Sequence, residues 1–293
     1  MNKDTQRAWV NEALDEVLEA LACRTSISGI LVFKGARVLN RRLESTPRQS
    51  YDIDSNLSEA FVRQFPSRAA QQQYIQAELE IALSTYFREQ AIVHYEVLRV
   101  AVKPWPRKEH PREWNAFKVK ITLSDRARPG TLGLPTLTID LAAPEPLGPS
   151  ATAPLLVGAN EIVAYTLERI AGEKFRAFLS SLPTYRAKIH KPGEAVRAKD
   201  IYDIARIVAA KSLENTKFWT SAGSEFRSAC ECRFVDCDGL SSFEEQLEVT
   251  EAAYDADVTI PKDTTFRDAW SALVSVVRYF ERSGLVPFRF PLP

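Results

Sequence analysis

Two aspartates one residue apart, Asp52 and Asp54, have the clearest chemistry in this chain. On a β-strand their side chains would point to the same face, while Ile53 between them would enter the core. Adjacent carboxylates repel each other unless a cation lies between them, and the hard ions Mg²⁺ and Mn²⁺ take oxygen ligands that they often share with substrate phosphates. The pair therefore predicts a divalent metal site. Because Asp-x-Asp is a common pattern, a solvated turn is the alternative.

A glycine turn precedes the two aspartates. Residues 30–33 form a short apolar run that predicts a buried strand, and Gly35 allows a tight turn and a close approach of the backbone to a ligand. Residues 36–43 fit a helix, whose start would present free N–H groups and the positive end of its dipole. A strand, a glycine turn and a helix start, followed by paired carboxylates, form the minimum needed to hold a nucleoside triphosphate and its metal ions.

Asp140 is the candidate for a third carboxylate. Residues 136–141 alternate between polar and apolar side chains, so Thr138 and Asp140 would share one face of a strand. If that strand lies beside the strand of Asp52 and Asp54, the three carboxylates complete a metal site. The alternative is a polar, outward-facing residue near the end of a strand.

A lysine and an aspartate in the second half of the chain could complete the chemistry. Lys174 flanks the apolar stripe of a predicted helix. It is either a solvated lysine or a cation that stabilises charge on a leaving pyrophosphate. Asp200 and Asp203 are three residues apart and share one face of the next helix. Asp200 could cap that helix, pair with Lys174 or help to activate an attacking hydroxyl.

Composition sets broad limits on the function. The 293 residues include 38 basic and 38 acidic side chains, so the net charge is zero and no overall field indicates a nucleic-acid-binding protein. No apolar run is long enough to span a membrane, and the polar N-terminus is unlike a signal peptide, so we expect a cytoplasmic protein. Cys230, Cys232 and Cys237 are close in sequence, but zinc normally takes four ligands in spaced pairs. We therefore expect reduced thiols.

The elements that must position these residues divide the chain into two halves. Alternating or apolar runs predict strands at 51–55, 94–102, 116–123 and 136–141. Apolar residues at helical spacing predict helices over 6–22, 68–90, 159–181, 198–212, 241–253 and 264–284. The Pro-rich stretch 143–149 has the composition of a linker. We expect an α+β fold, with a small mixed sheet in residues 1–148 and a mostly helical domain in residues 149–293 that contributes to the active-site cleft.

Four segments of the chain resemble, in order, the motifs of the nucleotidyltransferase toxins of the AbiEii/AbiGii type, a family that includes the mycobacterial MenT toxins. The family patterns are roughly FKGGTxL, RFSEDID, LEExxAEKxxAL and RDxYDL. The chain has FKGARVL at 33–39, RQSYDID at 48–54, LERIAGEKFRAF at 167–178 and KDIYDI at 199–204. Order and spacing agree over residues 30 to about 208.

The resemblance implies a nucleotidyltransferase-like N-terminal domain and a Mg²⁺-dependent transfer of a nucleoside monophosphate from an NTP to an acceptor. Matched residue by residue, it implies catalytic roles for Asp52, Asp54, Lys174 and Asp200. Asp140 lies outside the four motifs, and the strand pattern alone makes it a candidate metal ligand beside Asp52 and Asp54. The nucleotide-binding residues it implies are Lys34, Gly35, Ala36, Arg48, Ser50 and Lys174. In related toxins the acceptor can be the 3′ end of tRNA, which blocks translation. An RNA acceptor and a cognate antitoxin are therefore the expected partners.

A local basic stretch fits an RNA acceptor. Between Arg99 and Arg128 there are nine basic and three acidic residues, a net charge of +6, with Trp105 and Trp114 among them. Basic side chains contact phosphates, and aromatic rings stack on unpaired bases. The alternative is a solvated hairpin.

The chain departs from the family pattern at its phosphate turn. Ala36 and Arg37 stand where the family has Gly and Thr, so a hydroxyl near the phosphates is missing, and Tyr51 replaces a glutamate. Two alternatives to the toxin function stay open. One is a nucleotidyltransferase that acts on a small molecule or a protein, and the other is a non-catalytic member that binds a nucleotide or a partner.

Overall fold

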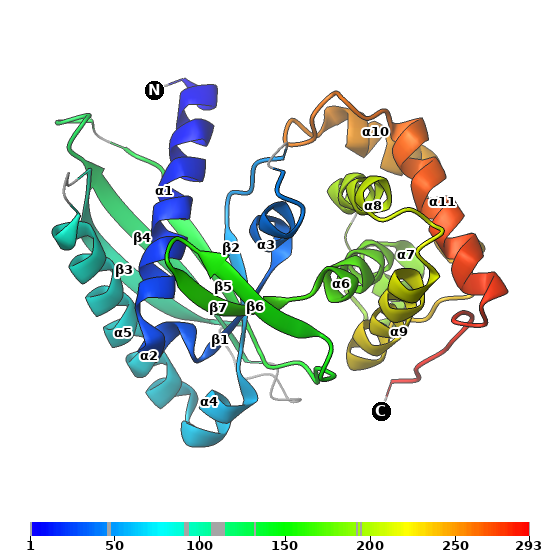
Figure 1. Cartoon of the computed structure of the whole chain (residues 1–293), viewed down its shortest axis with the longest axis horizontal. Helices are drawn as coiled ribbons and strands as arrows, with labels where there is room; N and C mark the ends of the chain where they lie inside the picture. The colour runs from blue at the N-terminus through cyan, green and yellow to red at the C-terminus, as the bar shows by residue number, and fades with distance from the viewer. Residues whose placement is uncertain are drawn as a thin grey trace. The chain divides into compact units, whose positions relative to one another are not determined.

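The chain forms two compact units, seen in the computed structural model of Figure 1, which describes residues 2–45, 48–90, 94–106, 115–131, 133–191, 193 and 195–292. The first unit comprises Met1–Val38, Gln49–Leu147 and Thr152–Ala164, and the second comprises Leu39–Arg48, Gly148–Ala151 and Tyr165–Pro293. The domain boundary predicted at residue 148 stays a prediction.

A mixed sheet is the centre of the first unit. In the described residues it has seven strands in the order β3-β4-β5-β2-β1-β7-β6. Its strands are β1 (Leu31–Lys34), β2 (Ile53–Leu57), β3 (Tyr95–Trp105), β4 (Ala116–Asp125), β5 (Leu137–Ala142), β6 (Thr152–Val157) and β7 (Asn160–Tyr165). Strand β2 is antiparallel to β1 and parallel to β5, so two segments far apart in sequence lie side by side.

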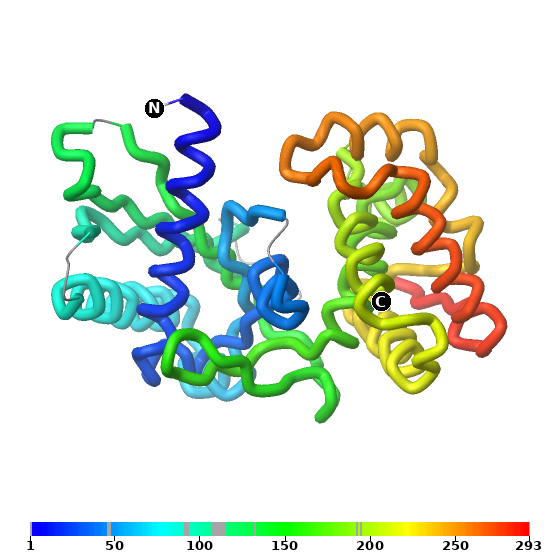
Figure 2. Tube along the Cα trace, turned by 45° about the horizontal axis from the view of Figure 1, so that its top comes forward, coloured from blue at the N-terminus to red at the C-terminus, as the bar shows by residue number. Residues whose placement is uncertain are grey.

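Helices cover one face of this sheet. They are α1 (Lys3–Cys23), α2 (Thr25–Ser28), α4 (Glu59–Gln64) and α5 (Arg68–Glu89). Helix α5 packs on β3, and α1 packs on α5 and reaches β5 and β6, as Figures 1 and 2 show from two directions. The apolar side chains of β5 are buried, whereas Thr138 and Asp140, which alternate with them, are half-buried. The alternation in sequence thus separates a core face from a more open face.

The second unit is helical. It contains α6 (Leu167–Leu179), α7 (Pro183–Lys188), α8 (Ala198–Ala210), α9 (Thr216–Arg233), the 3₁₀ helix η1 (Leu240–Ser242), α10 (Leu247–Ala256) and α11 (Phe266–Arg282). Helix α6 packs on α8 and α9, and α11 packs on α8 (Figure 2). Buried aromatic rings fill its core, and the rings of Phe175 and Phe280 are 5.5 Å apart between centroids. No helix in the described part of the chain has the length and apolar character needed to cross a membrane.

Helix α3 (Gly35–Arg42) links the two units, because the boundary between them falls after Val38. It begins immediately after β1, as the sequence predicted. Its last turn carries Arg41 and Arg42, which complement the negative end of the helix dipole.

Most of the predicted strands and helices are confirmed, but the helix predicted over 159–181 is wrong in its first part. Residues 160–165 form strand β7, in which Ile162 and Ala164 are buried while Glu161 and Val163 are exposed. This two-residue period is that of a strand, and helix α6 begins only after Thr166, whose side chain accepts a hydrogen bond from the Arg169 N–H. Strand β6 and helix α9 were not predicted.

Candidate metal and nucleotide site

Three carboxylates lie together in the first unit. Asp54 is on β2, and the parallel pairing of β2 with β5 places Asp140 directly beside it. Asp52 lies just before β2, and all three side chains are half-buried. One carboxylate oxygen from each residue lies within 4.8 Å of those of the other two. The strand pairing that a third carboxylate at Asp140 requires is therefore present.

Gly35 makes room for Asp54. Its φ is +80°, a conformation that favours glycine, and a Cβ atom at this position would lie 2.8 Å from the Cβ of Asp54 and collide with the carboxylate. The turn therefore brings the backbone at the start of α3 against the carboxylate cluster. The first N–H groups of a helix are a natural seat for phosphate.

Arg37 and Ser50 hold the segment that carries Asp52. The Ser50 hydroxyl lies 2.9 Å from the Asp52 carboxylate and donates to it. The buried Arg37 guanidinium donates to the main-chain oxygen atoms of Ser50 at 2.8 Å and of Asp52 at 3.3 Å, and it forms a 2.6 Å ion pair with Asp15 on α1. Arg37 thus holds the segment that leads into β2 against α1. In the sequence, Arg37 is notable only as a departure from the family pattern, and no local pattern predicts this role.

The surroundings of Asp140 favour a bound cation. Burial raises the pKa of Asp140, Lys118 on β4 opposes this rise, and the charge of Asp52 adds to it. The Nζ atom of Lys118 lies 3.5 Å from Oδ1 of Asp140. Among the described residues that oxygen has no hydrogen-bond partner, although it is shielded from water. A sheltered carboxylate oxygen that has a lysine at ion-pair distance and no close hydrogen bond, next to two other carboxylates, fits a hard divalent cation.

The remaining nucleotide-binding candidates of the first unit lie around this cluster. Lys34 ends β1 and is paired in register with Asp54. Ala36 follows Gly35 in the first turn of α3 and is buried, so its methyl group occupies the place of the family's second glycine without exposing a side chain. Lys34 and Gly35 thus lie beside Asp54, Ser50 lies beside Asp52, and Ala36 follows Gly35 in the chain. Whether these residues bind a nucleotide stays a prediction.

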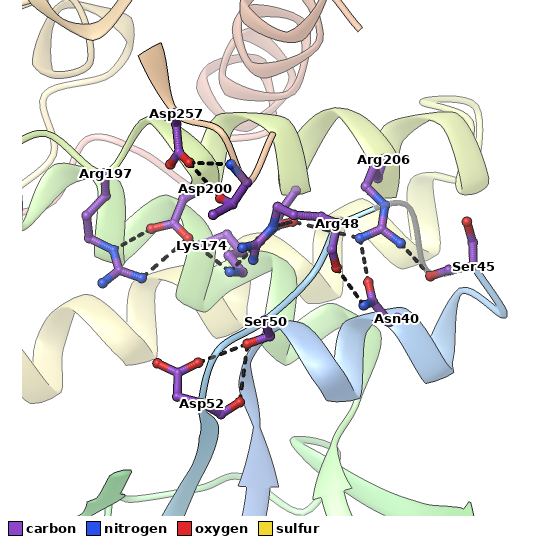
Figure 3. Close-up of polar contacts among 12 residues, drawn as sticks. Asn40, Ser45, Arg48, Ser50, Asp52, Lys174, Arg197, Asp200, Arg206 and Asp257 are labelled. Carbon is purple, nitrogen blue, oxygen red and sulfur yellow. Dashed lines mark hydrogen bonds and ion pairs between the residues drawn. The ribbon is translucent and has the colours of Figure 1, made fainter. Parts of the chain in front are cut away.

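Lys174 lies in a buried ion-pair network of the second unit (Figure 3). Its Nζ atom is 2.9 Å from Oδ1 of Asp200 and 2.6 Å from Oδ2 of Asp203, and both aspartate side chains are fully buried. Arg48 donates two hydrogen bonds to Asp203, at 3.0 and 2.8 Å. Arg197 forms a 2.6 Å ion pair with Asp200. Pairing with Lys174 was one of the three roles that the sequence left open for Asp200, and the part of Asp203 was not predicted.

The network keeps all of its members charged. Burial alone would favour the neutral forms, but the two carboxylates outweigh it and raise the pKa of Lys174. Burial is likewise outweighed at Asp200, whose pKa is lowered by Arg197 and Lys174, and at Asp203, whose pKa is lowered by Lys174 and Arg48. Asp200 does not cap α8 with its side chain. The structure thus places Arg48, Lys174 and Asp200 together, and their roles in nucleotide binding or catalysis stay predictions.

The predicted basic stretch is described only in part. Arg107, Lys108, Arg112 and Trp114, with Glu109 and Glu113, lie outside the described residues. The described basic residues lie on β3, β4 and the turn that follows β4.

The fold is that of nucleotidyltransferases. A putative nucleotidyltransferase of H. pylori superimposes with a TM-score of 0.50 at 10% identity, covering 97% of each chain. MenT4, a nucleotidyltransferase toxin of Mycobacterium tuberculosis, superimposes with a TM-score of 0.53 at 13% identity, covering 94% of this chain and 84% of that one. No curated protein matches the chain in sequence.

A family match then gives the particular class. Residues 16–284 match the family described as "Nucleotidyl transferase AbiEii toxin, Type IV TA system". The chain therefore belongs to the AbiEii nucleotidyltransferase toxins, and it is a nucleotidyltransferase. The α+β fold class and the family resemblance predicted from the sequence are confirmed.

Proposed function

We propose that this nucleotidyltransferase transfers the nucleoside monophosphate of an NTP to the 3′ end of a tRNA in a Mg²⁺-dependent reaction, and that a cognate antitoxin neutralises it. The observation that carries the proposal is the cluster of Asp52, Asp54 and Asp140, whose oxygens lie within 4.8 Å of one another beside the Gly35 turn. Because NTP and tRNA are cytoplasmic substrates, we place the reaction in the cytoplasm.

The reaction is a substitution at phosphorus. The acceptor hydroxyl oxygen bonds to the α-phosphorus, the bond from that phosphorus to the bridging oxygen breaks, and pyrophosphate leaves with the electron pair while the hydroxyl proton passes to solvent. Divalent cations, when bound, neutralise the charge that builds up on the phosphoryl oxygens. The protein positions the reactants: three carboxylates hold the cations, and the start of a helix holds the triphosphate.

The chain's residues divide this work between holding the metal ions and holding the nucleotide. Asp52, Asp54 and Asp140 are the proposed metal ligands, and Asp52 is kept in place by its hydrogen bond from Ser50. The start of α3, with Lys34 and the Gly35-Ala36 turn, is the proposed seat of the phosphates.

The second unit supplies the other candidates. Lys174 and Asp200 are proposed as catalytic residues, and Arg48 and Lys174 as nucleotide-binding residues, on the strength of the family motifs. Their ion pairs and hydrogen bonds with Asp200 and Asp203 provide a second, purely structural explanation for these residues, and substitution of the pair distinguishes the two.

The proposal is tested by incubating the purified protein with each labelled NTP, Mg²⁺ and total RNA. We expect label in the tRNA fraction for the wild type and none for Asp54→Asn, which keeps the shape of the side chain and removes its charge. Asp4→Asn, an exposed aspartate on α1, is the matched control and should behave as the wild type. Expression in cells should arrest growth for the wild type and the control only.

Two results would contradict the proposal in different ways. If label enters a small molecule or a protein instead of RNA, the reaction stands and the acceptor is wrong. If the wild type and Asp54→Asn are equally harmless and neither binds an NTP with Mg²⁺, the chain is a non-catalytic member of its family.

A further inference from the structure

The sheet continues its open face beyond Asp140 onto β4 and β3. Strand pairing sets Lys118 opposite Asp140 and Lys103 opposite Lys118. Residues that are paired across strands share a face, and so do residues two apart along a strand. Lys120 on β4 and Trp105 on β3 therefore point to the same face as Asp140.

The ring of Trp105 is available to a ligand. Trp105 is 59% exposed, which is unusual for the largest side chain. The Nζ atom of Lys118 lies 5.6 Å from the centroid of its ring and 3.5 Å from Oδ1 of Asp140. A single lysine thus spans the distance between an exposed aromatic face and the carboxylate cluster.

Cations line the rest of this face. Lys103 and Lys120 are both exposed, and Arg99, paired with Thr122, extends the row along β3. From Trp105 to Arg99 the strand covers about 20 Å at the usual rise per residue. Glu96, opposite Ser124, lies at the far end from Asp140. The charge nearest the cluster is therefore positive, which complements a chain of phosphates.

We propose that the surface formed by Trp105, Lys103, Lys118 and Lys120 is the acceptor subsite, and that it binds the single-stranded 3′ end of an RNA with one unpaired base stacked on Trp105. This inference rests on the proposed function, since it places the acceptor beside the proposed metal ligands. An exposed ring beside a row of cations is the usual platform for unpaired bases and their phosphates. In a duplex the bases are already stacked, so a blunt duplex cannot use the ring.

Lys118 connects the subsite to the reacting centre. Its Nζ atom forms an ion pair with Asp140, and its charge opposes the rise that burial causes in the pKa of that carboxyl. A divalent cation held by the carboxylates would take over this neutralisation, and the lysine would then be available to a phosphate of the acceptor. Lys118 is for this reason excluded from the binding test, because its replacement would also change the metal site.

The test measures binding without chemistry. Fluorescence anisotropy with a labelled single-stranded RNA of roughly twelve nucleotides, without NTP, gives the affinity directly. We expect Trp105→Ala to bind about fivefold to a hundredfold more weakly, the range that the loss of one stacked base produces, and Trp105→Phe to retain most of the affinity. Leu98→Ala is the matched control, because Leu98 is also on β3 and 61% exposed but has no aromatic face.

The cations are tested by the salt dependence of the same binding. Lys103→Ala and Lys120→Ala should each lower the slope of log K against log salt by about 0.7, the value for one phosphate contact on a single strand. Lys217→Ala, an exposed lysine of α9, should leave the slope unchanged. Circular dichroism confirms that each variant is folded.

Three results would overturn the subsite. Trp105→Ala could bind as tightly as Leu98→Ala, a blunt RNA duplex could bind as tightly as the single strand, or the lysine variants could keep the full salt slope. If the enzyme labels a protein or a small molecule and RNA does not compete, the subsite falls while the proposed reaction stands. If no NTP is turned over but Trp105→Ala still loses affinity for single-stranded RNA, the proposed reaction and the acceptor role fall, and the surface stands as an RNA-binding surface alone.

Discussion

Replacing Lys174 with methionine removes one charge from a buried network and keeps the length of the side chain. Breaking a buried ion pair by removing one partner typically costs about 3–5 kcal/mol, because the other charge stays buried. Here Asp200 keeps Arg197 at 2.6 Å and Asp203 keeps its two hydrogen bonds from Arg48. We therefore expect the lower end of that range, about 3 kcal/mol.

The double variant Lys174→Met/Asp200→Asn should recover part of this loss. With Asp200 neutral, Arg197, which is half-exposed, can turn to water, and the Arg48–Asp203 pair stays intact. We expect the two substitutions to be non-additive by about 1–3 kcal/mol, which is usual for residues in one network. Lys217→Met, an exposed lysine, is the control and should change stability by less than about 0.5 kcal/mol.

Native-state hydrogen exchange over α6 and α8 is the appropriate measurement, since it reports the opening free energy of these helices without assuming that both units unfold together. Additive substitutions, or a cost for Lys174→Met below about 1 kcal/mol, would refute the reasoning from the buried geometry. Nucleotide transfer by the double variant then separates two roles. A stable but inactive double variant supports a catalytic role for the Lys174–Asp200 pair, whereas activity that returns with stability shows that catalysis needs the charge of neither side chain.

Three further predictions concern the carboxylates. Gly35→Ala should abolish nucleotide transfer and destabilise the first unit by more than the roughly 1–3 kcal/mol of a strained φ, because the new Cβ atom would collide with Asp54. The control is Gly130→Ala, at a position with φ +73° and open space around it. In thermal melts it should show only the cost of the strained φ, and it should keep its activity. Because the pKa of Asp140 is raised, its charge destabilises the metal-free protein as pH rises through the aspartate range, so Asp140→Asn should raise the Tm without metal. The same variant should lose the stabilisation by Mg²⁺, which is about 2.7 kcal/mol at a hundredfold excess over Kd. An unchanged response to Mg²⁺ would contradict this prediction. Because the pKa values of Asp200 and Asp203 are lowered in the folded protein, the network stabilises the second unit at pH values above the ordinary aspartate pKa, and this stabilisation is lost as pH falls through the folded-state pKa values. Hydrogen exchange in α8 should therefore accelerate in acid. An opening free energy that does not change with pH would count against this prediction.

The sequence predicted correctly those features of the structure that depend on residues close together in the chain. The two-residue period around Ile53 and along residues 136–141 is local, so it fixed which side chains enter the core and which carboxylates do not. The helical spacing in α1 and α11 worked for the same reason. It failed at 160–165, where a short run with small and β-branched residues fits a strand or a helix and only the pairing of β7 with β1 decides.

The sequence by itself determined the chemistry that this protein has available: paired carboxylates, a glycine turn, and four motifs in the order of the AbiEii toxins. The tertiary structure decided which of these groups meet. Asp140 reaches Asp54 only because β5 pairs with β2 in parallel across a long separation in sequence, and Arg37 supports Asp52 only because α1 brings Asp15 to it. Such contacts depend on packing between distant segments, which no local period in a sequence encodes.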